Sequence, residues 1–213
     1  MVKRRLVLTL LVISTVYLIV CINLFLVMFN LGLYQQEFEK LHTYEKIANA
    51  DAVALDMIKY LKSESAIITS GAFTKNEVDH LRDVRIIVQR LQILSVIMLL
   101  IWGGVVFRRN FKILASAMVY SGIFLVMLIA ALFLMANNFE WLFVKFHLIF
   151  FPQGNWMFSN ESSLIRLFPK QFFVDMFTNI LLRVLVCSVI LFVAGNVILS
   201  EKIKMFIKKS KNI

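Results

Sequence analysis

The chain has 213 residues, of which 60% are hydrophobic and 17% are charged, and it carries a formal net charge of +10. Soluble domains are typically about 45–50% hydrophobic and about 25% charged. With 20 Phe and 10 Met in addition, the composition excludes a soluble globular protein and a disordered one, and it indicates a membrane protein.

Four long apolar stretches predict an all-α integral membrane protein with four transmembrane helices in a single membrane domain. Residues 6–36 and 113–139 carry no formal charge, and each exceeds the roughly 20 residues that cross a bilayer core as a helix. Two shorter uncharged stretches follow Arg90 and Arg183, and both reach spanning length if the arginine extends to the interface. We place the spans at about 6–30, 86–107, 113–136 and 180–199.

Basic residues predict the orientation of these spans. The N-terminus, the connection between the second and third spans, and the C-terminal tail together hold eleven basic residues and one acid, so they account for the whole net charge of +10. By the positive-inside rule these segments face the cytoplasm, and 31–85 and 137–179 form an extracellular cap. The charge also indicates contact with anionic lipid rather than with nucleic acid. The eleven basic residues are Lys3, Arg4, Arg5, Arg108, Arg109, Lys112, Lys202, Lys204, Lys208, Lys209 and Lys211.

The connection between the first and second spans contains the first candidate site residues. Asp51–Lys62 has the apolar spacing of an amphipathic helix. Thr74 and Glu77 form a capping box, which predicts a helix that begins there and runs into the second span. His80 lies in the second turn of that helix, and Asp83 lies one turn further on the same face. The carboxylate is therefore placed to orient or stabilise the imidazole at the outer membrane interface.

The connection between the third and fourth spans is unusually aromatic. Both prolines of the chain and two of its three tryptophans lie between Trp141 and Asp175. A loop of this composition would aggregate if it stood in water, so we expect it to lie at the lipid interface or to line a pocket. His147 lies within this apolar surround, directly after Phe146.

Each of these features also has a structural interpretation. Interfacial histidines are usually hydrogen-bonding groups of the fold, interfacial aromatics are usually anchors, and Arg90 and Arg183 can simply extend to the headgroups. His42, in a charged stretch, keeps the structural interpretation. Function is favoured for His80 and His147 because two separate segments place a histidine at the same interface, one with a carboxylate and one among aromatic rings.

Other chemistries find no support in the sequence. There is no GxSxG nucleophile motif, no CxxC or HExxH metal motif, and no glycine-rich phosphate loop. We therefore expect no metal and no cofactor.

Two motifs, the second in two parts, resemble those of the bacterial lipoprotein intramolecular transacylases, and the resemblance covers essentially the whole chain. Near the second span, the chain reads Phe73-Thr74-x-x-Glu77-x-x-His80-x-x-Asp83-Val84. After the third span, it reads Phe146-His147-x-x-Phe150-Phe151-Pro152-x-Gly154-x-Trp156, followed by Leu167-Phe168-Pro169-x-x-Phe172-Phe173-x-Asp175. Four spans, an external cap and this chain length are also similar to that family.

The resemblance implies an acyl transfer within one membrane lipoprotein of the bacterial plasma membrane. The sn-2 acyl chain of the diacylglyceryl group would move to the α-amine of the N-terminal cysteine, giving a lyso-form N-acyl S-monoacylglyceryl lipoprotein. His80 and His147 would share the acid and base roles, with Asp83, Asp175 and Arg166 in support. The implied substrate-binding residues are Phe146, Phe150, Phe151, Gly154, Trp156, Arg90 and Arg183.

Two kinds of alternative function remain open at this point. One is an interfacial phospholipid hydrolase or an intermolecular acyltransferase. The other is a membrane scaffold or pH-responsive subunit without enzymatic activity, in which the histidines act as switch groups.

Overall fold

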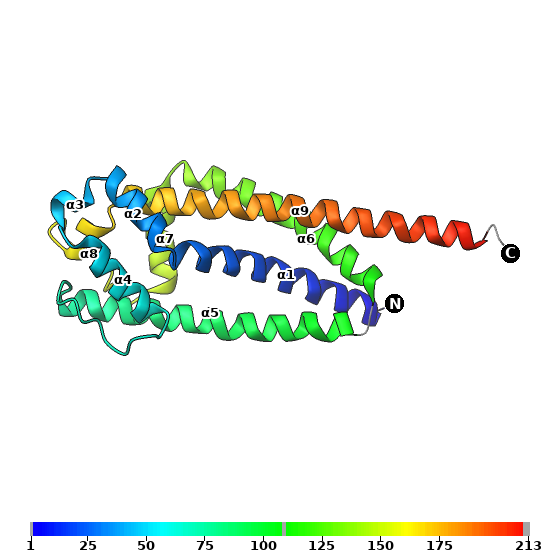
Figure 1. Ribbon diagram of the computed structural model, residues 1–213, viewed down its shortest axis with the longest axis horizontal. Coiled ribbons are helices and arrows are strands. Elements are labelled where there is room, and N and C mark those ends of the chain that lie inside the picture. The colour runs from blue at the N-terminus through cyan, green and yellow to red at the C-terminus, as the bar shows by residue number, and fades with distance from the viewer. Residues whose placement is uncertain (1, 108–109, 211–213) are drawn as a thin grey trace. The chain divides into compact units, whose positions relative to one another are not determined.

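The computed structural model describes residues 2–107 and 110–210, with the side chains of residues 3–107 and 110–201. Within these ranges every regular element is a helix (Figure 1). Three of the basic residues that predict the orientation, Arg108, Arg109 and Lys211, lie outside the described residues. The helices are α1 (Val2–Met28), α2 (Leu31–Lys40), α3 (Thr43–Lys46), α4 (Ala50–Leu61), α5 (Lys75–Phe107), α6 (Phe111–Ala136), α7 (Phe139–Phe150), α8 (Ser163–Leu167) and α9 (Lys170–Ser210).

Four of the described helices, α1, α5, α6 and α9, are long and apolar enough to cross a membrane. This confirms the all-α class and the number of spans. Two of them begin well before the predicted spans, for local reasons. Helix α5 begins directly after Thr74 of the capping box, and α9 begins at Lys170 directly after Pro169, a residue that a helix interior excludes. The added residues at the start of α5 and α9 include polar side chains, which therefore lie before the apolar stretch of each helix.

The chain divides into two compact units. The cap unit consists of Leu24–Gln92 and Met135–Ile180. The bundle unit consists of Met1–Asn23, Ile93–Leu134 and Leu181–Ile213. Both histidines of interest belong to the cap unit, so the candidate site can be described within that unit alone.

In the bundle unit, α6 and α9 approach each other closely at two glycines. A Cβ atom on Gly122 would lie 2.7 Å from the carbonyl oxygen of Ser188, and one on Gly195 would lie 2.8 Å from that of Ala115. No larger residue fits at these separations without moving a backbone. Because lipid is as apolar as the helix surfaces, such close backbone packing is a main source of helix association in membranes.

The cap unit has a hydrophobic core of its own, built around aromatic rings. Tyr34 of α2 lies 5.1 Å from Phe172, and Phe38 lies 5.9 Å from Phe168, measured between ring centroids. Helix α4 covers this cluster with the apolar face predicted for Asp51–Lys62. Figure 1 shows α2, α3, α4 and α8, which all belong to the cap unit, lying close together. The cap is therefore a packed structure rather than a pair of loops.

The aromatic segment after α6 is partly helical, whereas its composition predicted a loop. Helix α7 begins after Asn138, whose side chain accepts a hydrogen bond from the backbone N–H of Trp141 at 3.1 Å. An asparagine at this position stabilises the start of a helix, because its side chain satisfies a backbone N–H group that has no partner within the helix. The helix exposes large apolar side chains, including Phe146 and Ile149, and buries His147.

Candidate active site

His80 of α5 and His147 of α7 converge in the cap unit. Their ring centroids lie 6.1 Å apart, and the ring planes are inclined by 27°. Each residue is only 8% exposed. The sequence indicated that both histidines lie at one interface, and the structure shows that they form a pair.

A buried carboxylate, Glu77, holds the start of α5 against α8. Its Oε2 accepts hydrogen bonds from the backbone N–H of Thr74 at 2.7 Å and from the Thr74 hydroxyl at 2.8 Å, which confirms the capping box. Its Oε1 accepts a third from the backbone N–H of Leu164 at 2.8 Å. Glu77 is 0% exposed. Because His80 lies one turn after Glu77, this contact fixes the start of α8 to the first turns of α5, which carry the histidine.

Aromatic rings form the walls around the pair. Phe151, which follows α7, lies 4.7 Å from His80 and 5.5 Å from His147 between ring centroids, so it contacts both. The walls are apolar and exclude water from most of the imidazole surface. The other neighbouring rings are Phe143 at 4.1 Å, Phe146 at 5.3 Å and Trp156 at 4.7 Å from His147, and Phe158 at 5.6 Å from His80.

The tautomer of His147 follows from its hydrogen bond. Its Nδ1 lies 2.8 Å from the carbonyl oxygen of Phe143, one helical turn earlier. A carbonyl only accepts, so Nδ1 carries the proton and Nε2 of the neutral ring has a free lone pair. Burial lowers the pKa of His147 below its ordinary value of 6.5, and the hydrogen bond to Phe143 opposes this effect. His147 is therefore placed to accept a proton through Nε2 at neutral pH.

We expect the His147 ring to titrate below pH 6.5, because the pKa of the folded state is lowered. Between that pKa and 6.5 the unfolded chain binds more protons, so the contribution of His147 to stability falls as the pH decreases through this window. NMR of protein labelled with ¹³C-histidine, with a His147→Asn variant to assign the resonance, measures the midpoint directly. A midpoint at or above 6.5 would contradict the burial of a neutral ring.

Asp83 links α5 to the loop after α7. Its Oδ2 accepts hydrogen bonds from Nε2 of Gln153 at 2.8 Å and from Nδ2 of Asn155 at 2.7 Å. Both Asp83 and Asn155 lie close enough to His80 to act on its ring. Asp83 thus helps to hold the loop in place in addition to its electrostatic effect on the imidazole.

Two other predicted substrate-binding residues shape the same loop. Phe150 packs on Phe146, with 4.7 Å between ring centroids. Gly154 has a φ of 79°, a left-handed conformation that favours glycine, and its N–H donates to the carbonyl of Phe151 at 3.1 Å. This turn reverses the chain so that the following residues return to the histidines.

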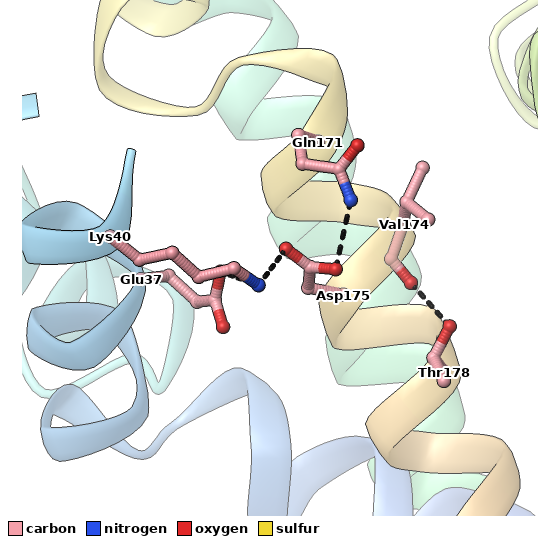
Figure 2. Close-up of polar contacts among 6 residues, drawn as sticks. All are labelled: Glu37, Lys40, Gln171, Val174, Asp175 and Thr178. Carbon is pink, nitrogen blue, oxygen red and sulfur yellow. Dashed lines mark hydrogen bonds and ion pairs between the residues drawn. The ribbon is translucent and has the colours of Figure 1, made fainter. Parts of the chain in front are cut away.

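Two predicted supporting residues make other contacts. Asp175 of α9 accepts hydrogen bonds from Nζ of Lys40 at 2.7 Å and from Nε2 of Gln171 at 2.9 Å (Figure 2). The Arg166 guanidinium donates to the backbone carbonyl of Lys46. These contacts join α9 to α2 and α8 to the end of α3. In the structure both residues hold parts of the cap together.

The two arginines predicted to extend to the membrane interface lie in different units. Arg90 is exposed on α5 within the cap unit, and Arg183 is half-buried on α9 within the bundle unit. Sequence reasoning did not single out Phe143, Phe158 or Asn155. Phe143 precedes His147 by four residues and is recognisable once the segment is known to be helical, whereas only the fold places Phe158 and Asn155 beside the histidines.

Comparison with known proteins gives a consistent result. The family model described as lipoprotein intramolecular transacylase Lit matches residues 9–173. The structure of the membrane integral lipoprotein intramolecular transacylase Lit from Bacillus cereus is similar with a TM-score of 0.82, covering 94% of this chain and 97% of that chain at 23% identity. A structure of the same protein with one histidine replaced by alanine has a TM-score of 0.76, at 23% identity and with 94% and 95% of the two chains covered. At this identity the likeness shows a shared fold.

A further relative is a protein of Aquifex aeolicus (strain VF5) described as uncharacterized. It is 33% identical over 106 residues, which are 49% of this chain and 47% of that protein. The match therefore spans about half the length of this curated relative.

Proposed function

The chain belongs to the lipoprotein intramolecular transacylase (Lit) family, and we propose that it moves the sn-2 acyl chain of a diacylglyceryl-modified lipoprotein to the α-amine of the N-terminal cysteine. The observation that carries this proposal is the pair of buried imidazoles, 6.1 Å apart and walled by aromatic rings. The product is a lyso-form lipoprotein with an N-acyl group and a single acyl chain on the glyceryl group.

The reaction needs a group that removes a proton from the attacking amine. An unperturbed α-amine has a pKa of about 7.7–8.0, so part of it is already neutral near pH 7. When the amine lone pair attacks the ester carbonyl, nitrogen becomes positively charged and must lose a proton. Nε2 of His147 has the free lone pair for this step, because Nδ1 is bonded to the Phe143 carbonyl.

The reaction also needs a proton on the leaving group. As the C–N bond forms and the C–O bond breaks, the glyceryl oxygen leaves as an alkoxide and must be protonated. His147 returns to this oxygen the proton that it took from nitrogen. Burial lowers the pKa of His80 to about 4, so its neutral ring relays that proton between the two reacting groups and does not retain it. One proton leaves nitrogen and one reaches oxygen, so the enzyme ends in its initial state without a covalent acyl-enzyme.

The aromatic walls support the proposal through positioning. An intramolecular transfer requires the amine and the ester carbonyl to approach to about 3–3.5 Å, and holding them there accounts for a large part of the acceleration. Phe151 contacts both imidazoles and Trp156 packs on one, so acyl chains bound against these rings keep the reacting groups between the proton carriers. Excluding water also suppresses hydrolysis of the ester.

We place this site at the outer face of the bacterial plasma membrane, with both termini in the cytoplasm. The support is the distribution of charge, because the segments on one side of the four spans hold the entire net charge of +10. Membrane lipids surround the four spans in this arrangement.

The proposed transfer makes substrate and product isomers. When the purified protein is reconstituted with one diacylglyceryl lipoprotein, we expect the intact mass of the lipoprotein to stay constant. Tandem mass spectrometry of its N-terminal peptide should show an acyl group on the cysteine nitrogen and one chain on the glyceryl group.

The alternatives leave different signatures in the same spectrum. A hydrolase lowers the mass by one acyl chain and leaves the amine free. An acyltransferase that uses phospholipid raises the mass by one chain and keeps both glyceryl esters. A scaffold changes neither the mass nor the fragments. Any of these three results in place of the isomer rejects the proposed transfer.

A further inference from the structure

Unpaired polar atoms gather at the histidine pair. Six buried side-chain nitrogen or oxygen atoms lack a hydrogen-bond partner within the described part of the chain. Three of the six belong to residues beside the pair, namely Nδ1 of His80, Oδ1 of Asn155 and Nε1 of Trp156. A buried polar atom without a partner is costly, so a cluster of them indicates groups that a ligand satisfies.

The side chain of Asn155 has a defined orientation. Its Nδ2 donates to Oδ2 of Asp83 at 2.7 Å, and a carboxylate only accepts, so the amide nitrogen must face Asp83. Oδ1 therefore points away from that carboxylate and presents an acceptor. The same amide also lies within hydrogen-bond reach of the His80 ring, where it raises the pKa that burial and the charge of His147 lower. The acceptor lies next to one of the two proton carriers.

Trp156 supplies a hydrogen-bond donor, whereas Asn155 supplies an acceptor. Its ring lies 4.7 Å from that of His147, and its Nε1–H is a donor that cannot accept. The phenylalanine rings packed on His147 carry no N–H or O–H. Apart from the proton carrier His80, the indole is thus the described ring around His147 that can donate a hydrogen bond to a substrate oxygen.

We propose that Asn155 and Trp156 recognise the two reacting groups, with Oδ1 of Asn155 accepting a hydrogen bond from the substrate α-amine and Nε1–H of Trp156 donating one to the ester carbonyl. This inference rests on the proposed function. A primary amine has two N–H groups and one lone pair. The lone pair attacks, one N–H faces Nε2 of His147, and the second needs an acceptor. The carbonyl oxygen gains negative charge during attack, so a donor aimed at it stabilises the transition state.

A methyl group on the substrate amine tests the role of Asn155. A lipopeptide with N-methyl-cysteine at its N-terminus has one N–H, which the base requires, so the hydrogen bond to Asn155 is lost. We expect the unmodified protein to prefer the primary amine by about 10- to 100-fold in kcat/KM, the range for one buried hydrogen bond. Asn155→Leu, which is close in volume and has no acceptor, should bring this ratio near one.

The ratio of kcat/KM for the two substrates is measured on one preparation of protein, so it does not depend on the fraction of that protein that is active. Gln153→Leu is the matched control, because it also removes a hydrogen bond to Oδ2 of Asp83 but leaves the Asn155 acceptor. It should keep the preference for the primary amine. If Asn155→Leu does not fold, Asn155→Ala gives the same ratio. A preference that persists without the Asn155 acceptor overturns its assignment.

Trp156→Phe tests the donor, because it keeps an aromatic ring and removes the N–H. We expect kcat to fall by about 10²–10³-fold, as for other oxyanion donors, with a smaller change in KM. An unchanged kcat in the folded variant overturns this role. If the unmodified protein forms no N-acyl product from the primary amine, the proposed function itself fails. If it forms that product but both variants behave like it, only this inference fails.

Discussion

Replacing His147 with asparagine is expected to lower kcat by about 10²–10⁴-fold, the range for one acid–base group. The asparagine amide nitrogen occupies a position similar to that of Nδ1, so it retains a donor for the Phe143 carbonyl, which the histidine contacts at 2.8 Å. The substitution removes Nε2, the atom to which we assign the proton transfer. Initial rates of N-acyl product formation, measured by mass spectrometry on reconstituted protein, give the change.

His80→Asn should have an effect of similar size, because the second imidazole completes the proton transfer. The matched control is His42→Asn. His42 lies in the same cap unit, its side chain is 72% exposed, and its φ is 54°, a left-handed conformation that asparagine tolerates better than alanine. This control should be as active as the unmodified protein. Near-normal turnover by a well-folded His147→Asn protein would reject the two-histidine mechanism.

Glu77→Ala is expected to lower the free energy of unfolding by about 2–4 kcal/mol, since buried donors that lose their acceptor cost about 1–3 kcal/mol each. The substitution leaves the backbone N–H groups of Thr74 and Leu164 without the carboxylate that accepts from both. Unfolding of detergent-solubilised protein, followed by circular dichroism, measures the change. Glu77→Gln keeps one carbonyl oxygen as an acceptor, so its free energy of unfolding should lie between those of Glu77→Ala and the unmodified protein.

Glu140→Ala is a suitable control for this experiment. Glu140 pairs with Lys170 at 2.9 Å, but its side chain is 75% exposed, and exposed ion pairs contribute little to stability. Glu77→Ala should also reduce kcat, because α8 is no longer attached to the turn that precedes His80. If Glu77→Ala and Glu140→Ala are equally stable, the buried carboxylate does not have the structural role assigned to it.

The sequence by itself determined the parts of this protein that depend on local composition and spacing. The spans are recognisable because a helix in lipid must be apolar over its whole length, whatever its neighbours are. The start of α5 is recognisable because Thr74 and Glu77 satisfy each other three residues apart. Composition alone predicted a loop where α7 lies, because apolar content does not report the asparagine cap that begins the helix.

The tertiary structure decided which candidate residues meet. Asp83 and Asp175 are equivalent in sequence, since each is a carboxylate near an aromatic or histidine motif. Only the fold shows that Asp83 binds Asn155, whereas Asp175 pairs with Lys40 of α2. The tautomer of His147 could likewise be assigned only from the structure, because it follows from the hydrogen bond to Phe143, one helical turn earlier.

The physical reason is the distance along the chain. The hydrogen bond from Leu164 to Glu77 joins residues 87 positions apart in the sequence. The hydrogen bond from Asn155 to Asp83 joins residues 72 positions apart. A capping box or an apolar span has a fixed spacing because the helix repeat imposes it. Contacts between separate helices depend instead on how whole faces pack, and no spacing within one sequence encodes that outcome. The four spans and the two candidate histidines were therefore recognisable in advance, whereas the contacts that these histidines make between α5 and α7 were not.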